Sequence, residues 1–235
     1  MTLQKSENVA RAQRILDAAA RLISHYGYDK TSVSDIADAA GISKGAIYLH
    51  FASKDELFEA VLLREMLAYS TSWLAHIEAD PNGGTIGSIY KAVLHALNDN
   101  AFMSAIVKQD MRLFGTYLRK PNNLFSSMES PALRAEFLQA MQAAGAIRAD
   151  VDAGVMAHIM DLFSYGFIGI SEFRKPADLP AYDTVLATIA EMMDRMLTPS
   201  TGHPGAAGKA VIRQLAATIN AQFAEMQRTT EKNKQ

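Results

Sequence analysis

The stretch Thr31–Phe58 reads TSVSDIADAAGISKGAIYLHFASKDELF and predicts three successive helix starts. Ser32 and Ser53 each stand three residues before an acidic residue, which is the spacing of a capping box at a helix N-terminus. Gly41 ends the first short helix, and Ser43 can cap the second. Two short helices joined by a tight, glycine-containing turn form a helix-turn-helix.

The second short helix has the composition expected of a helix that enters the DNA major groove. Gly45 and Ala46 are small and let its backbone approach the bases. Lys44, Tyr48 and His50 supply groups suited to phosphates or base edges, and the helix N-terminus adds backbone N–H donors. A small apolar core would fix the angle between the two helices: Val33, Ile36, Ala37, Ala40, Ile47 and Phe51.

Helical periodicity extends over almost the whole chain. Before the quoted stretch, apolar residues recur with the spacing of one buried helix face, and Gly27 follows where a left-handed C-cap is needed. After it, we find no strand-like alternation and no internal repeat. We therefore expect an all-α protein, with further helices near 54–79, 85–99, 102–118, 124–144, 152–173, 181–197 and within 205–230.

Composition limits the possible functions. The 235 residues are 49% hydrophobic and include no cysteine, which excludes disulfides and thiolate metal sites. No run is long and apolar enough for a membrane span, and the N-terminus lacks the apolar core of a signal peptide, so we expect a cytoplasmic protein. The net charge is −2, so bulk charge does not by itself indicate a polyanionic partner.

The upstream sequence extends the motif into a recognisable pattern. Residues 14–23 read RILDAAARLI and residues 26–28 read YGY. With Thr31–Phe58 they resemble the N-terminal DNA-binding domain of the TetR family of transcriptional regulators. The resemblance covers 10–62, about a quarter of the chain. It implies a three-helix helix-turn-helix domain over 10–62, followed by a larger helical ligand-binding and dimerisation domain over 63–197.

The same resemblance assigns roles around the motif. It makes Ser43–His50 the recognition helix, places Ser32 and Tyr48 near phosphates, and lets Lys54 reach the DNA backbone. Leu49 departs from the family, in which many members carry a polar residue or histidine there, and this thins the polar contacts. Three of these residues have alternative explanations. Tyr48 could be a packing residue, His50 a solvated or capping histidine, and Lys54 an ordinary surface lysine at a helix start. The implied DNA-binding residues are Ser32, Ser43, Lys44, Gly45, Ala46, Tyr48, His50 and Lys54.

The larger part is expected to provide the homodimer that a palindromic operator requires. Family members pair through their last two core helices, which correspond to 152–173 and 181–197 here. Gly166 and Gly169 lie where two helices could approach closely. An ordinary internal core is the alternative explanation of the same apolar residues.

A small-molecule effector would bind between the long helix 54–79 and the helices of 85–144. Twelve methionines and few buried charges favour a bulky, mostly apolar ligand. Residues of these types at helical spacing are more often core than pocket. The candidate lining residues are Met66, Tyr69, Trp73, His76, Phe102, Met103, Met111, Phe114 and Tyr117.

The segment 205–230 predicts one additional amphipathic helix. It could wrap the dimer, cover the effector site, or pack on its own subunit. Gly205–Lys209 superficially matches a phosphate-binding loop, but Ala210 replaces the required serine or threonine. We expect neither a cofactor nor a metal, because the histidines lack ligand spacing and no catalytic motif is present.

These observations predict a repressor that leaves its operator when a small effector binds, with no membrane partner. The helix over 54–79 would transmit the change, because it begins at the DNA-binding domain. The first alternative is an all-α binding protein or enzyme that uses the helix-turn-helix only as a scaffold. The second is a regulator controlled by a protein partner.

Overall fold

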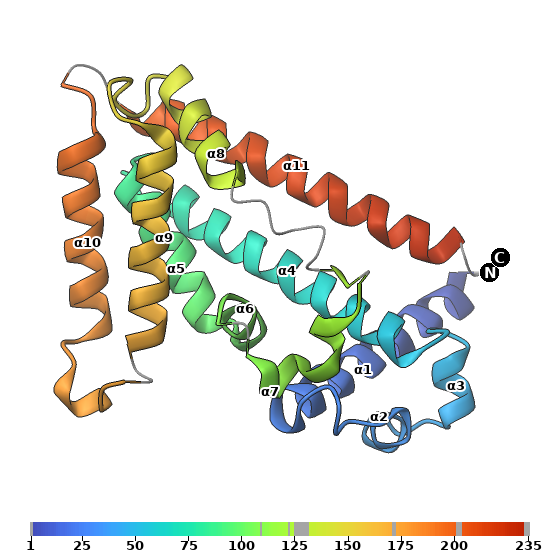
Figure 1. Cartoon of the computed structure of the whole chain (residues 1–235). Helices are drawn as coiled ribbons and strands as arrows, with labels where there is room; N and C mark the ends of the chain where they lie inside the picture. The colour runs from blue at the N-terminus through green and yellow to red at the C-terminus, as the bar shows by residue number, and fades with distance from the viewer. Residues whose placement is uncertain are drawn as a thin grey trace. The chain divides into compact units, whose positions relative to one another are not determined.

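The computed structural model describes residues 2–108, 110–121, 123–124, 132–170, 173–200 and 204–232. Within these residues every regular element is a helix, which confirms the predicted all-α fold (Figure 1). The chain divides into two compact units. Unit 1 comprises Met1–Met66, Ala101–Glu129 and Ala224–Gln235, and unit 2 comprises Leu67–Asn100 and Ser130–Phe223.

Unit 1 begins with four helices in chain order, the last of which continues into unit 2. A later part of the chain then returns to unit 1 as two short helices and a 3-10 helix. The elements are α1 (Thr2–Tyr26), α2 (Val33–Ala40), α3 (Lys44–Tyr48), α4 (Lys54–Ala79), α6 (Ala101–Val107), α7 (Met111–Phe114) and η1 (Gly115–Arg119).

The core of unit 1 joins the helix-turn-helix to residues far downstream. The ring of Phe58 is fully buried, with its centroid 4.8 Å from those of Tyr28 and Tyr117. Aromatic pairs at such separations stabilise a core beyond the burial of their area. This compact unit is therefore larger than the segment 10–62 that the sequence indicates, because residues 102–117 complete its core.

Gly27 connects α1 to this downstream part. Its φ of 86° confirms the left-handed conformation expected after α1. A Cβ at this position would lie only 2.1 Å from the carbonyl oxygen of Arg112, and the next residue, Tyr28, donates its N–H to Leu113 over 2.7 Å. Glycine is thus required twice, once for the backbone angle and once for the close approach of α7.

Unit 2 packs its helices in close pairs. Gly87 lies against helix α10 (Tyr182–Leu197), where a Cβ would come within 2.2 Å of the carbonyl oxygen of Ala190. Asp194 strengthens this contact by accepting hydrogen bonds from Thr85 Oγ1 at 3.0 Å and from the Gly87 N–H at 2.7 Å. Besides the second part of α4, the helices are α5 (Ile86–Asp99), α8 (Ala132–Ala143), α9 (Ala153–Gly169), η4 (Pro176–Asp178), α10 (Tyr182–Leu197) and most of α11 (Pro204–Lys232).

One predicted helix is interrupted, one is described only in part, and one is shorter than expected. The helix expected over 102–118 stops at Val107, because the carboxylate of Asp110 accepts the N–H of Arg112 over 2.9 Å and starts the separate helix α7. The helix expected over 124–144 is described only from Ala132, since 125–131 lie outside the described residues. The one expected over 152–173 ends at Gly169, and residues 171 and 172 are not described.

The first part of α11 packs on unit 2, its own unit. A Cβ at Gly208 would lie 1.9 Å from the carbonyl oxygen of Gly84, so the missing side chain allows this contact. Lys209 Nζ donates to the carbonyl oxygens of Asp80 at 2.9 Å and Glu78 at 3.2 Å, at the C-terminal end of α4. The resemblance to a phosphate-binding loop therefore reflects packing. None of the described helices is both long and apolar enough to span a membrane.

Candidate nucleic-acid interface

The helix α2 begins with the predicted capping box. Ser32 Oγ accepts the N–H of Asp35 at 3.1 Å, and the Asp35 carboxylate accepts the N–H of Ser32 at 2.9 Å. The Ser32 hydroxyl also donates to the Asp35 carboxylate at 2.7 Å, and this bond and the one from the Ser32 N–H lower the pKa of Asp35. Gly41 closes the helix with φ 67°, in the left-handed region. The first half of the motif is thus fixed by the residues that the sequence indicates.

The helix α3 is short and is capped by Ser43, whose Oγ accepts the N–H of Ala46 at 3.2 Å. The α-helix covers Lys44–Tyr48 rather than the whole predicted recognition helix. Its last turn tightens, because the N–H groups of His50 and Phe51 both bond to the carbonyl oxygen of Ile47, at 2.8 and 2.9 Å. The side chains of Ile47 and Phe51 are buried and hold α3 on unit 1.

The opposite face of α3 is exposed and carries most of the predicted DNA-binding residues. Tyr48 is 47% exposed and Leu49 is 81% exposed. Gly45 is open, since a Cβ there would meet only Ser43 Oγ, at 3.9 Å. Of the predicted DNA-binding residues in the motif, Ser32, Ser43, Lys44, Gly45 and Tyr48 are exposed, and Ala46 and His50 are half-buried.

Lys54 lies in a different environment from the α3 residues. Its ammonium nitrogen is 4.0 Å from the ring centroid of Tyr28, a cation–π contact. Burial lowers the pKa of Lys54, while the nearby carboxylates of Asp29 and Asp55 oppose that shift. Its contact with the DNA backbone stays a prediction, and in the free protein this lysine belongs to a polar cluster.

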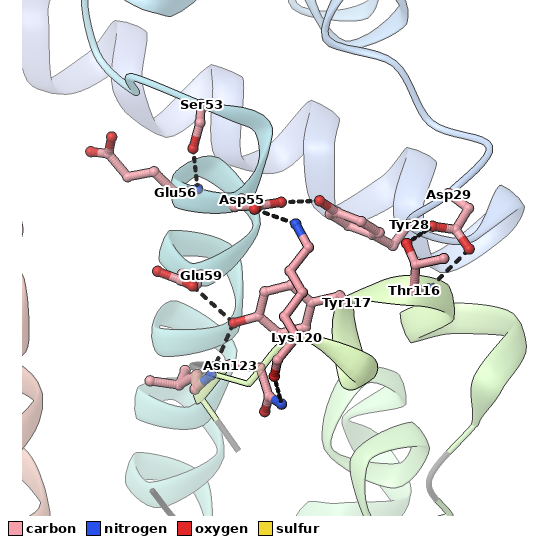
Figure 2. Close-up of polar contacts among 11 residues, drawn as sticks. Tyr28, Asp29, Ser53, Asp55, Glu56, Glu59, Thr116, Tyr117, Lys120 and Asn123 are labelled. Atoms are coloured by element: carbon pink, nitrogen blue, oxygen red, sulfur yellow. Dashed lines mark hydrogen bonds and ion pairs between the residues drawn. The ribbon is translucent and has the colours of Figure 1, made fainter. Parts of the chain in front are cut away.

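That polar cluster, which we call the Asp55 cluster, joins the start of α4 to η1 and to the loop after α1 (Figure 2). Tyr28 and Lys120 both donate hydrogen bonds to the Asp55 carboxylate. Burial opposes the ionisation of Asp55, but the hydrogen bonds from Lys120 and Tyr28 prevail and lower its pKa. Alongside, the Asp29 carboxylate accepts the hydroxyl and the N–H of Thr116. No sequence motif marks Lys120 or Thr116, and so their part in this cluster could not be predicted from the sequence.

A second link from η1 to α4 lies next to the Asp55 cluster. Tyr117 Oη donates to the Glu59 carboxylate at 3.0 Å and accepts the N–H of Leu124 at 3.0 Å. Burial raises the pKa of Tyr117, and burial also raises the pKa of Glu59. The residues after α6 are therefore bound to unit 1 by hydrogen bonds as well as by the aromatic core.

The candidate effector residues are divided between the two units. Met111 is exposed, and the other members in unit 1 are buried. In unit 2, Trp73 is 5% exposed and Tyr69 is half-buried, with its hydroxyl donating to the Val93 carbonyl oxygen at 3.4 Å. His76 is exposed, and its ring stacks on that of His95. The buried members in unit 1 are Met66, Phe102, Met103, Phe114 and Tyr117.

The helices predicted to form the dimer each have a buried and an exposed apolar face. Cβ atoms at Gly166 and Gly169 would meet nothing within 4 Å in this chain. The buried face contains Met156, Met160, Leu186 and Met193. The exposed face, which we call the α9–α10 surface, contains Val155, Leu162, Phe163, Tyr165, Met192 and Met196. In the described part of the chain no three His, Asp or Glu side chains gather as a metal site requires.

Comparison with known proteins agrees with this geometry. Residues 15–61 match the family model described as bacterial regulatory proteins, tetR family. The chain is 28% identical to the A-factor receptor protein of Streptomyces griseus over 194 residues, which is 81% of this chain and 63% of that protein. It is 47% identical to the regulator AcrR of Shigella flexneri over 57 residues, 24% of this chain and 26% of that protein.

The chain thus spans less than two thirds of the length of these relatives. Among solved structures, AibR in complex with isovaleryl coenzyme A and operator DNA aligns with a TM-score of 0.51 and 24% identity. That alignment covers 78% of this chain and 97% of AibR, and it shows a shared fold. The similarity to the tetR family of bacterial regulatory proteins thus lies in the helix-turn-helix domain, over residues 15–61.

Proposed function

We propose that this chain is an effector-responsive transcriptional repressor that binds a palindromic operator in the cytoplasm as a homodimer. The observation that carries the proposal is the exposed face of α3. The buried side chains of Ile47 and Phe51 anchor this helix on its other face. An exposed helix anchored in this way fits the major groove, and its small residues allow the backbone close to the bases. No observation on this chain favours an enzyme.

The DNA contacts follow from the chemistry of each exposed group. Lys44 is exposed at the first position of α3 and can neutralise a phosphate. Tyr48 presents a phenol that can donate to a phosphate oxygen, and the hydroxyls of Ser32 and Ser43 lie at the two helix starts. Because only a few cations are available, we expect the shape of the DNA to contribute to specificity.

The α9–α10 surface supports the homodimer. Large apolar side chains there are exposed in the single chain, which is typical of a protein interface. Gly166 and Gly169 leave room for a second pair of helices to approach. A two-fold dimer places its recognition helices about 34–36 Å apart, one turn of DNA, and therefore reads an inverted repeat.

The effector is proposed to be a mostly apolar molecule that binds in unit 2 near Tyr69 and Trp73. It must favour the conformation that does not bind DNA, and each factor of ten in the equilibrium requires about 1.4 kcal/mol of preference. The helix α4 runs from Lys54 in unit 1 to Ala79 in unit 2, and so it can transmit the change. Trp73 is the only tryptophan in the sequence, and its fluorescence provides a direct assay of effector binding.

The experiment that tests DNA recognition is selection of binding sites from random duplex DNA by the purified full chain. We expect an enriched inverted repeat. Tyr48→Ala should weaken binding to the selected site, whereas Tyr26→Ala, which changes a tyrosine of similar exposure on α1, should not. A folded protein that enriches no sequence would contradict the proposal and favour the scaffold alternative.

A further inference from the structure

Leu49 is the most exposed large apolar side chain among the described residues of unit 1, at 81%. It directly follows α3, yet its φ of −72° and ψ of −21° are still helical. Its N–H bonds to the carbonyl oxygen of Gly45 at 3.3 Å, and so Leu49 and Gly45 lie one turn apart on the same face.

The glycine leaves space beneath the leucine. Side chains in a helix lean toward its N-terminus, and so the Leu49 isobutyl group extends over the turn that contains Gly45. Gly45 has no side chain to cover it, and even a Cβ there would meet nothing closer than Ser43 Oγ at 3.9 Å. The result is a single apolar group standing on the outer face of the recognition helix.

The groups on the floor of the major groove are hydrogen-bond donors and acceptors, apart from the 5-methyl group of thymine. On the exposed face of α3, Lys44 and Tyr48 offer polar groups, and Gly45 offers only backbone. An exposed leucine gains nothing from a phosphate or from a polar base edge, but it gains from an apolar methyl group that it shields from water.

From this geometry we propose that Leu49 is a specificity-determining residue that recognises a thymine 5-methyl group in each half-site. The inference rests on the proposed function, because it requires α3 to lie in the major groove. Many members of the family carry a polar residue or histidine at this position. The leucine found here would then add specificity and would not merely remove polar contacts.

The test removes the methyl group and the leucine separately and together. Each thymine of the selected operator is replaced by 2′-deoxyuridine, in symmetric pairs, and dissociation constants are measured by fluorescence anisotropy at one salt concentration. At one thymine position we expect wild type to lose affinity by about fourfold per half-site, as burial of one methyl group implies. Leu49→Ala should bind the thymine operator more weakly and show no further loss with deoxyuridine at that position.

Two variants serve as controls for the dependence of the deoxyuridine effect on Leu49. Leu49→Met keeps an apolar side chain and should keep the deoxyuridine effect. Val9→Ala truncates another exposed apolar residue of unit 1 and should also keep it in full. All variants should melt like wild type, because Leu49 and Val9 contribute little buried area.

The possible outcomes separate the inference from the function on which it rests. Failure to select any DNA site overturns the proposed function itself. Specific operator binding without any sensitive thymine overturns only the role of Leu49. The same conclusion holds if wild type and Leu49→Ala lose equal affinity at every deoxyuridine position.

Discussion

Thr116 binds the Asp29 carboxylate twice, through its N–H at 3.0 Å and through its hydroxyl at 2.5 Å. These residues are 87 positions apart in the sequence, and the contact ties η1 to the loop that precedes α2. Together with the Asp55 cluster, it fixes the residues after α6 on the helix-turn-helix domain. The stability of this domain therefore depends on residues far outside the motif.

Loss of the Lys120 ammonium should destabilise unit 1. Lys120→Met removes the cation from Asp55, and because both side chains are partly exposed we expect a loss of about 0.5–1 kcal/mol. Urea unfolding at neutral pH measures this change. Arg195→Met breaks an exposed pair with Glu191 within α10 and should cost less. Equal losses in the two variants would show that the Asp55 cluster has no special role.

The stability of the protein in acid should depend on Asp55. The folded-state pKa of this carboxyl is lowered, and so the unfolded chain binds the proton first as the pH falls. The stabilisation is present above the unfolded pKa of about 3.9 and is lost as the pH falls through the folded pKa. Asp55→Asn should therefore be less stable than wild type at pH 7 and should lose less stability below about pH 4.

The pKa of Glu59 is shifted in the opposite direction from that of Asp55. Burial raises its pKa, so the folded state binds the proton more readily and gains stability as the pH falls through that raised value. Glu59→Gln should lack this gain, and unfolding free energies between pH 3 and pH 7 can reveal it. If both variants changed the pH profile in the same direction, the assigned pKa shifts would be wrong.

A methyl group at position 45 should separate stability from DNA binding. Gly45→Ala meets no atom closer than 3.9 Å and replaces glycine in a helix, so the protein should gain up to about 1 kcal/mol. The new side chain would stand between the backbone and the bases, and operator affinity should fall about tenfold. Gly205→Ala, also an open position at a helix start, should leave operator affinity unchanged. If Gly45→Ala kept the operator affinity of wild type, the backbone at position 45 would not lie close to the bases.

A charge on the α9–α10 surface should prevent dimerisation. Leu162 is 59% exposed, and so Leu162→Glu should fold normally but sediment as a monomer. Operator affinity should then fall at least about 100-fold, because the second half-site no longer binds as part of the same molecule. Val9→Glu is a control on unit 1 and should sediment like wild type. A Leu162→Glu dimer would contradict the proposed interface.

The helix-turn-helix could be predicted from the sequence because its determinants are local. The caps at Ser32 and Ser43 and the turn at Gly41 each act within a few residues, and the structure confirms all three. The attachment of 101–124 to unit 1 could not be predicted, since it depends on pairs such as Tyr117 with Glu59 that are distant in the chain. A local motif carries no information about which distant segment completes its core.

The assignment of aromatic residues shows the same limit. Phe114 and Tyr117 have the composition and spacing of effector-lining residues, yet in the structure they contribute to the core around Phe58. Side chains of the same type serve either purpose, and only the fold distinguishes them. Whether these two residues also contact an effector stays a prediction.

Paired DNA recognition by a homodimer can be tested directly with two duplexes that share the same half-sites. One keeps the selected spacing, and the other separates the half-sites by five additional base pairs, which is about half a turn of B-DNA. We expect tight binding of one dimer to the first duplex and binding of the second duplex no tighter than to a single half-site. Equal affinity for the two duplexes would contradict paired recognition helices, and absence of binding to either would contradict DNA recognition by α3.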